Sequence, residues 1–174
     1  MEESLRSKLL RRQGVKQGYS GHSWLISSDK IFSSDIKGFG NFFPISWVEF
    51  EISRKFLFDG TVSADLGILA SPIKVHLLPG KHCPSLLELF SKRSKLPKIL
   101  IGKTATLNGE IAMLDSYEYS GCSLQGFSVR VGYCWFEFHC ESFQASYTDY
   151  EPDGIKSGTA SIKVYLGEWK MENS

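Results

Sequence analysis

Polar and apolar residues alternate along much of this chain, which is the pattern of strands that bury one face of a sheet. The alternation is clear at residues 73–78, where Val75 and Leu77 share one parity and Lys74 and His76 the other. Less regular patterns predict strands at residues 23–32, 45–58, 98–107, 110–118, 127–147 and 160–169. Roughly eight or more short strands are therefore expected, a number typical of a sandwich or a barrel.

One stretch departs from the strand pattern and predicts a helix at residues 84–92. Pro84 suits the first position of a helix, because a backbone nitrogen without a proton leaves no donor unpaired there. Leu86, Leu87 and Phe90 then follow on one broad apolar stripe. A helix this short is not stable alone in water, so we expect it to lie on a sheet and to bury these side chains.

Two dipeptides predict tight hairpin turns. Asn108 with Gly109, and Asp59 with Gly60, are residue types that tolerate the positive φ of a type I′ turn. Residues 67–71 are expected to form a loop. The predicted fold is mainly β, a two-sheet antiparallel barrel or sandwich with one short flanking α-helix.

The chain has 174 residues, of which 42% are hydrophobic and 13% aromatic, enough for one domain with one core. We expect this domain at residues 22–174, after a basic, glycine-dotted extension at residues 1–21 that nothing in the sequence anchors. The formal net charge is +1, whereas proteins that bind nucleic acid through its phosphates usually carry a basic excess. Nucleic acid is therefore not an expected partner.

No apolar segment of the kind that targets a chain for secretion or spans a bilayer is apparent in the sequence. We therefore expect no signal peptide, a start in the cytoplasm and no membrane insertion.

The four cysteines, Cys83, Cys122, Cys134 and Cys140, form no C-x-x-C pair, and the cytosol keeps thiols reduced. His139 is next to Cys140, but on a strand it points to the face opposite Cys134 and Cys140. These three side chains then do not converge on one ion. We expect reduced cysteines without a catalytic role, no metal site and no cofactor.

Catalytic motifs are absent from the sequence, which has no G-x-S-x-G elbow, no G-x-x-x-x-G-K-[ST] phosphate loop and no H-E-x-x-H helix. Glu49 and Glu51 share a strand face, but carboxylates at this spacing are usually the solvated side of a sheet. We expect no catalytic residues and a protein that is not an enzyme. An enzyme whose residues converge from distant positions is the least favoured alternative.

The most aromatic part of the chain, residues 127–147, has apolar side chains on both faces near Trp135. Tyr133 and Trp135 share one parity, and Phe136 and Phe138 share the other. A strand that is apolar on both faces is covered twice, either by a second layer of its own fold or by another subunit. Trp135, Phe136 and Phe138 are therefore candidate interface residues.

Three segments resemble the Hcp proteins, the tail-tube subunits of type VI secretion systems. The first is a strand, a short charged loop, and then Pro84, Ser85 and paired leucines that open a single helix, with Cys83 where the family usually has serine. The second is a late strand with a tyrosine- and proline-containing exit, and the third is an Asp-Gly loop followed by a closing strand that ends in Gly-Glu-Trp. The segments cover roughly residues 45–170, and the residues that carry the resemblance are Pro84, Ser85, Leu86, Leu87, Phe90, Phe143, Tyr147, Pro152, Asp153, Gly154 and Trp169.

The resemblance implies a two-sheet β-barrel with a helix at its flank, which assembles into six-membered rings that stack into a tube. It also implies partners, namely the sheath, the baseplate or spike, and effector proteins that the tube carries, and a bacterial cytoplasm with export through the secretion apparatus. The leading prediction is a structural ring subunit of the inner tube that also serves as an effector carrier. The alternative is a monomeric barrel or sandwich that binds an apolar ligand or a protein partner, and particle size in solution distinguishes the two.

Overall fold

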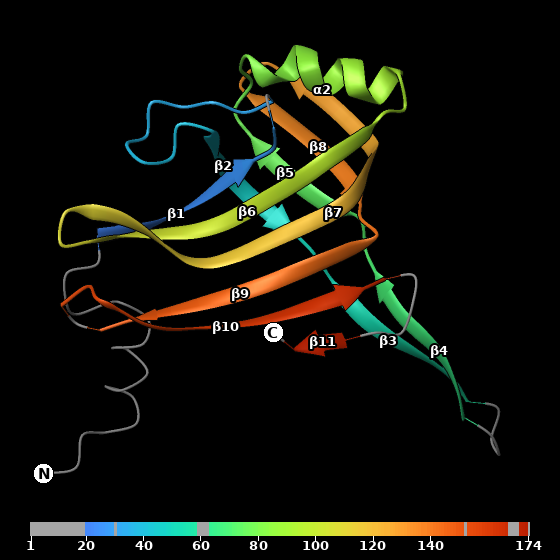
Figure 1. Cartoon of the computed structure of the whole chain (residues 1–174). Coiled ribbons are helices and arrows are strands. Elements are labelled where there is room, and N and C mark those ends of the chain that lie inside the picture. The colour runs from blue at the N-terminus through green and yellow to red at the C-terminus, as the bar shows by residue number, and fades with distance from the viewer. Residues whose placement is uncertain (1–19, 30, 59–62, 152, 167–170, 174) are drawn as a thin grey trace, which may run out of the picture.

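The computed structural model describes residues 20–29, 31–58, 63–151, 153–166 and 171–173 (Figure 1). Within these ranges the chain forms eleven strands and one helix. In chain order they are β1 (Ser20–Ser27), β2 (Phe42–Glu49), β3 (Ile52–Phe58), β4 (Ser63–Ala70), β5 (Ile73–Leu77), α2 (His82–Ser91), β6 (Lys95–Leu107), β7 (Glu110–Arg130), β8 (Tyr133–His139), β9 (Ser142–Tyr150), β10 (Lys156–Tyr165) and β11 (Met171–Asn173). The prediction of a mainly β fold with one short helix is confirmed.

Nine strands form one antiparallel sheet in the order β11-β10-β9-β7-β6-β1-β2-β5-β8, and β8 also pairs with β7. This extra pairing is possible because β7 is 21 residues long. One edge of β7 pairs with β9 at residues 115–120 and with β8 at residues 123–130, while β6 occupies the other edge. Strands β6, β1, β2, β5, β8 and β7 therefore close into a barrel, and β9, β10 and β11 extend the sheet beyond it (Figure 1).

The barrel interior is filled by side chains of one strand parity. In β5, Val75 and Leu77 are buried and lie opposite Phe136 and Cys134 of β8. Directly opposed residues of antiparallel strands point to the same face. Phe136 and Phe138 are 0% exposed, and a second subunit does not reach side chains in the core. The prediction that these two phenylalanines form an interface is therefore wrong, because the subunit's own core covers them.

Helix α2 lies across one end of the barrel (Figure 1) and begins at His82, two residues earlier than predicted. Its buried residues are His82 and Leu86, and Leu89 packs against the core. Leu87 is 52% exposed and Phe90 39% exposed, so the prediction that they are buried is wrong. Successive residues point about 100° apart around a helix, so a face shared by His82, Leu86 and Leu89 has its centre about 130° from Leu87 and about 70° from Phe90. Leu87 therefore points to solvent, and Phe90 lies at the border of the buried face. Among the described residues, no helix has the length and apolar character needed to cross a membrane.

The strand predicted at residues 45–58 is in fact two strands that belong to different sheets. β2 stays in the barrel, whereas β3 pairs with β4 in a separate two-stranded sheet. At the break, the ring of Phe50 contacts Tyr119 and Phe143 edge to face, with centroid separations of 5.8 and 5.2 Å. Phe50 thus anchors the point where the chain leaves the barrel, and the β3–β4 ribbon projects from the body of the molecule (Figure 1).

The hairpin predicted at Asn108 and Gly109 is confirmed, and it joins β6 to β7. Leu107 pairs with Glu110 across the turn. Asn108 and Gly109 have φ angles of 50° and 84°, which are the positive values that a type I′ turn requires.

Other turns and boundaries differ from prediction. The loop predicted at residues 67–71 is wrong, because residues 67–70 belong to β4, and the turn at residues 59–60 lies outside the described residues. β1 begins at Ser20, inside the predicted extension at residues 1–21, of which residues 1–19 are not described. Gly132, with φ 75°, makes a turn between β7 and β8 that the alternation of residues did not reveal.

Candidate functional site

The two glutamates considered for acid–base chemistry, Glu49 and Glu51, are both exposed. Glu51 lies at the break between β2 and β3. Its backbone N–H donates to Oγ of Ser71 at 3.0 Å, and its carbonyl accepts from the Ser71 N–H at 2.8 Å. These bonds close the base of the β3–β4 ribbon, which gives Glu51 a structural role.

Four ring side chains on the outer face of β2, β5 and β8 form what we call the aromatic stripe: Trp47, His76, Tyr133 and Trp135. Trp47 is 57% exposed and stacks on His76 with centroids 5.6 Å apart. His76 lies 5.5 Å from the Tyr133 ring, and its Nδ1 is hydrogen-bonded to the Tyr133 hydroxyl. The ammonium of Lys74 lies 4.5 Å from the ring centroid of half-buried Trp135. Trp135 thus faces outward and stays a candidate interface residue.

The outer face of α2 is a second exposed apolar surface. Leu87 and Phe90 are three residues apart on the helix, and side chains at this spacing are neighbours. Leu78, which precedes the helix, is also exposed. Exposed apolar side chains that gather on one face often mark a contact site.

Asp153 and Gly154, two of the residues that carry the resemblance, build the loop between β9 and β10. Oδ1 of Asp153 accepts a hydrogen bond from the Ile155 N–H at 3.0 Å, and Gly154 has a φ of 84°. Nδ2 of Asn108 donates to the Asp153 carbonyl, and a Cβ added at Gly154 would lie 2.7 Å from that nitrogen. The loop is therefore held against the β6–β7 hairpin, and both residues have a structural role.

The remaining residues of the resemblance are spread over the molecule. Phe143 is in the core, and Tyr147 is exposed with its hydroxyl 3.2 Å from that of Tyr117. Pro84 and Ser85 lie in the first turn of α2. Pro152 and Trp169 lie outside the described residues.

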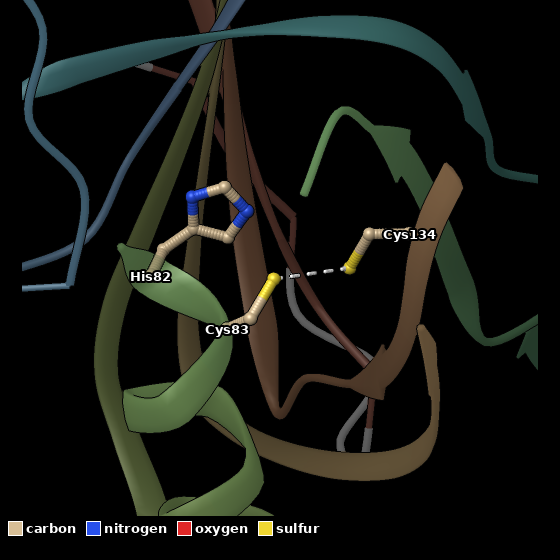
Figure 2. A group of neighbouring side chains, drawn as sticks. All are labelled: His82, Cys83 and Cys134. Atoms are coloured by element: carbon tan, nitrogen blue, oxygen red, sulfur yellow. Dashed lines mark hydrogen bonds between the residues drawn. The ribbon is translucent and has the colours of Figure 1, made fainter. Parts of the chain in front are cut away.

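Within the part of the chain that the structure describes, one set of metal-ligating side chains comes together that the sequence analysis missed: His82, Cys83 and Cys134 (Figure 2). His82 and Cys83 are the first two residues of α2, and Cys134 is on β8. One ligand atom from each lies within 4.8 Å of the others, and the two Sγ atoms are 3.8 Å apart. We call these three residues the thiol–imidazole cluster.

The cluster is largely buried. His82 is 2% exposed, Cys134 0% exposed and Cys83 half-buried. Burial lowers the pKa of His82, an effect that a hydrogen bond to the backbone of Leu78 opposes. Burial, together with the neighbouring Cys83, raises the pKa of the Cys134 thiol to about 12. The His82 ring packs against Phe43, with centroids 4.5 Å apart.

The sequence analysis grouped Cys134 with His139 and Cys140, which strand parity separates. Cys134 is brought to the cluster by a pairing between strands that are distant in sequence. It lies opposite Leu77 at the end of β5. The chain leaves β5 there and reaches the first turn of α2 within a few residues. No local pattern contains this information.

No protein-family model matches the chain, and no curated protein sequence matches it. Solved structures do. A structure described as a type six secretion system protein aligns with a TM-score of 0.73 at 12% identity, over 87% of this chain and 100% of the other. Hcp1 from Salmonella typhimurium aligns with a TM-score of 0.70 at 10% identity, over 88% and 100% of the two chains. A type VI secretion system effector from Yersinia pestis gives 0.55 at 11% identity, over 82% and 99%.

The fold is therefore Hcp-like, as the sequence resemblance predicted. At identities this low the likeness concerns the fold.

Proposed function

We propose that this protein is a structural subunit of a type VI secretion tube, that six copies close into a ring, and that rings stack end to end. The main supporting observation is that the Hcp-like fold extends over most of the chain and over the full length of the Hcp1 structure it resembles. The domain predicted at residues 22–174, extended to Ser20 by β1, is the single assembling unit in this proposal.

The β3–β4 ribbon supports assembly. Among the described strands, β3 and β4 pair with each other in a sheet of their own, so each strand has an outer edge. The backbone groups of an unpaired edge readily accept a strand or loop from another chain. The projection of the ribbon from the barrel (Figure 1) places these edges where a neighbouring copy reaches them.

The exposed apolar surfaces give a second physical reason. The aromatic stripe includes Trp47 at 57% exposure, and the outer face of α2 includes Leu87 at 52%. If the aromatic stripe of one copy packs against the α2 face of the next, both apolar surfaces are buried. Repeating this contact closes a ring when the rotation between neighbouring copies divides a full turn evenly. We propose Trp135, within the stripe, as part of such a contact.

The alternative, a monomer that holds an apolar ligand in its barrel, is disfavoured by the filled interior. Phe136, Phe138 and Tyr119 are among the largest fully buried side chains. Protein interiors packed in this way leave little room for a ligand. A monomeric module that binds a partner through its outer surface is the form of the alternative that remains.

The proposed role as a tube subunit also implies where the protein is located and which proteins it contacts. The subunit is not an enzyme, it resides in a bacterial cytoplasm before export through the apparatus, and it contacts the sheath, the baseplate or spike, and effectors. The likeness to a protein described as a secretion-system effector supports this setting.

The test is light scattering coupled to size-exclusion chromatography at micromolar concentration, with electron microscopy of the peak. We expect a ring with six times the mass of the 19.6 kDa chain. Trp47→Glu and Leu87→Glu place a charge on each exposed surface in turn, and the variant that breaks the ring identifies the contact. Far-ultraviolet circular dichroism confirms that each variant is folded. A wild-type monomer that does not associate on concentration contradicts the proposal and favours the binding module.

A further inference from the structure

Two thiols and one imidazole meet where the start of α2 lies next to β8. The imidazole has a buried nitrogen that makes no hydrogen bond to the described residues. Nε2 of His82 has no hydrogen-bond partner among the described residues, in a side chain that is 2% exposed. We propose that His82, Cys83 and Cys134 bind a thiophilic metal ion, and that this ion is Zn²⁺. All three ligands come from one chain, so the site does not require the proposed ring.

The separations fit a metal centre. Two thiolates bound tetrahedrally to zinc at about 2.3 Å lie roughly 3.8 Å apart. The Sγ atoms of Cys83 and Cys134 are 3.8 Å apart. The imidazole nitrogen is within 4.8 Å of both sulfurs, and a zinc-bound nitrogen lies roughly 3.5 Å from its sulfur neighbours. The nitrogen must therefore move toward the sulfurs by up to roughly 1.3 Å when the ion binds.

The hydrogen bonds around the cluster orient the imidazole and favour the thiolate form of Cys83, both of which metal binding requires. The His82 ring is hydrogen-bonded to the backbone of Leu78, and Nε2 is the ring nitrogen without a partner. Such a bond fixes the tautomer that leaves the Nε2 lone pair free for a metal. The Gly80 N–H points to Sγ of Cys83 at 3.5 Å, a contact that favours a thiolate. Figure 2 shows a nitrogen of the His82 ring on the side of the two thiols.

The cluster is buried but lies close to the surface on the side of His82 and Cys83. Cys83 is half-buried, and a surface hollow of about 460 Å³ borders His82, with Phe43 and Gly80 in its wall. Three protein donors leave a fourth tetrahedral position for water or another small ligand. The two thiolates and the imidazole suit Zn²⁺ and Cu⁺, whereas Mg²⁺ and Ca²⁺ require oxygen donors.

The ion has a structural consequence. Cys83 and Cys134 are 51 residues apart in sequence, so a metal bound by both clamps the start of α2 to β8. A metal ion that binds the folded chain but not the unfolded chain raises the free energy of unfolding by its free energy of binding.

The test uses the untagged full-length chain, fully reduced and freed of metal by chelation, under anaerobic conditions. Co²⁺ is the spectroscopic probe, because thiolate ligation gives a charge-transfer band in the near ultraviolet. Zn²⁺ is then titrated against the Co²⁺ form to obtain its stoichiometry and affinity. We expect one Co²⁺ per chain, displaced by one Zn²⁺, and a higher melting temperature when Zn²⁺ is bound.

Matched variants distinguish this cluster from other thiols. Cys83→Ser and His82→Phe should weaken Zn²⁺ binding by at least about tenfold, and Cys83→Ser should also lose part of the charge-transfer band. Cys140→Ser changes a half-buried thiol outside the cluster and should bind as the wild type does. Circular dichroism and the melting temperature of each metal-free variant show whether it is folded.

Three results overturn the proposal: no charge-transfer band in the folded, reduced wild type, wild-type affinity in folded Cys83→Ser, or equal weakening in Cys140→Ser. Preference for Cu⁺ with no measurable Zn²⁺ binding also contradicts it. A disulfide between Cys83 and Cys134 that gives no metal uptake after reduction would assign the pair to redox chemistry instead.

Discussion

Replacing Leu86 by alanine tests whether α2 is attached to the barrel by one face only. Leu86 is 0% exposed and belongs to the same buried cluster as Leu77 and Phe136. Leu87, the next residue, is 52% exposed on the same helix. Leu86→Ala and Leu87→Ala remove the same atoms and change helix propensity in the same way, so the difference between them isolates burial.

The expected magnitude follows from the burial. Removing a buried leucine side chain loses about 1.5–3 kcal/mol of transfer free energy, and the cavity left behind brings the usual total to about 2–5 kcal/mol. Because one wall of the cavity is a single helix that can settle inward, we expect Leu86→Ala to lower the free energy of unfolding by about 3 kcal/mol. Leu87→Ala should change it by less than about 0.5 kcal/mol.

The assay is urea unfolding followed by far-ultraviolet circular dichroism, at a protein concentration too low for the proposed rings to form, because association through Leu87 would shift the apparent stability. The two variants should show equal slopes and well-separated midpoints. Equal midpoints for Leu86→Ala and Leu87→Ala would refute the assignment of the buried face of α2.

Two further measurements examine the turn and a core thiol. Gly109→Ala places a side chain at a φ of 84° and should lower the free energy of unfolding by about 1–2 kcal/mol in the same urea assay, whereas an unchanged midpoint would contradict the type I′ turn. Burial, with the neighbouring Cys140, raises the pKa of Cys122 from its ordinary value of 9.0 to about 12. The unfolded chain therefore loses this proton first as the pH rises, so the stabilising contribution is complete below about pH 9 and is lost between about pH 9 and 12. Cys122→Ala should flatten this part of the stability profile, and an identical slope in wild type and variant would show that the thiol does not titrate differently in the fold.

Local chemistry made part of the fold predictable. Pro84 and the leucines after it predicted the helix, and Asn108 with Gly109 predicted the hairpin, because both signals act within a few residues. The buried face of α2 was not predictable in the same way. A broad apolar stripe allows several faces, and the barrel end beneath the helix selects the one that includes Leu86.

Features set by distant pairings were missed. The break after β2 depends on Phe50 meeting Tyr119 and Phe143, which no local pattern contains. The thiol–imidazole cluster depends on the register that places Cys134 opposite Leu77. The alternation around Trp135 correctly indicated apolar side chains on both faces of the strand, but only the closed barrel shows that Phe136 and Phe138 belong to the inner face.

The position of β8 in the barrel has a consequence for synthesis. β8 pairs with β5 on one side and with β7 on the other, and it spans Tyr133–His139 of a 174-residue chain. The barrel cannot close before the ribosome has made these residues, so the apolar faces of the earlier strands stay uncovered until then. Long-range β pairing of this kind folds slowly and exposes the chain to aggregation. Until β8 has been made, the nascent chain therefore has an open sheet whose apolar face is exposed to aggregation.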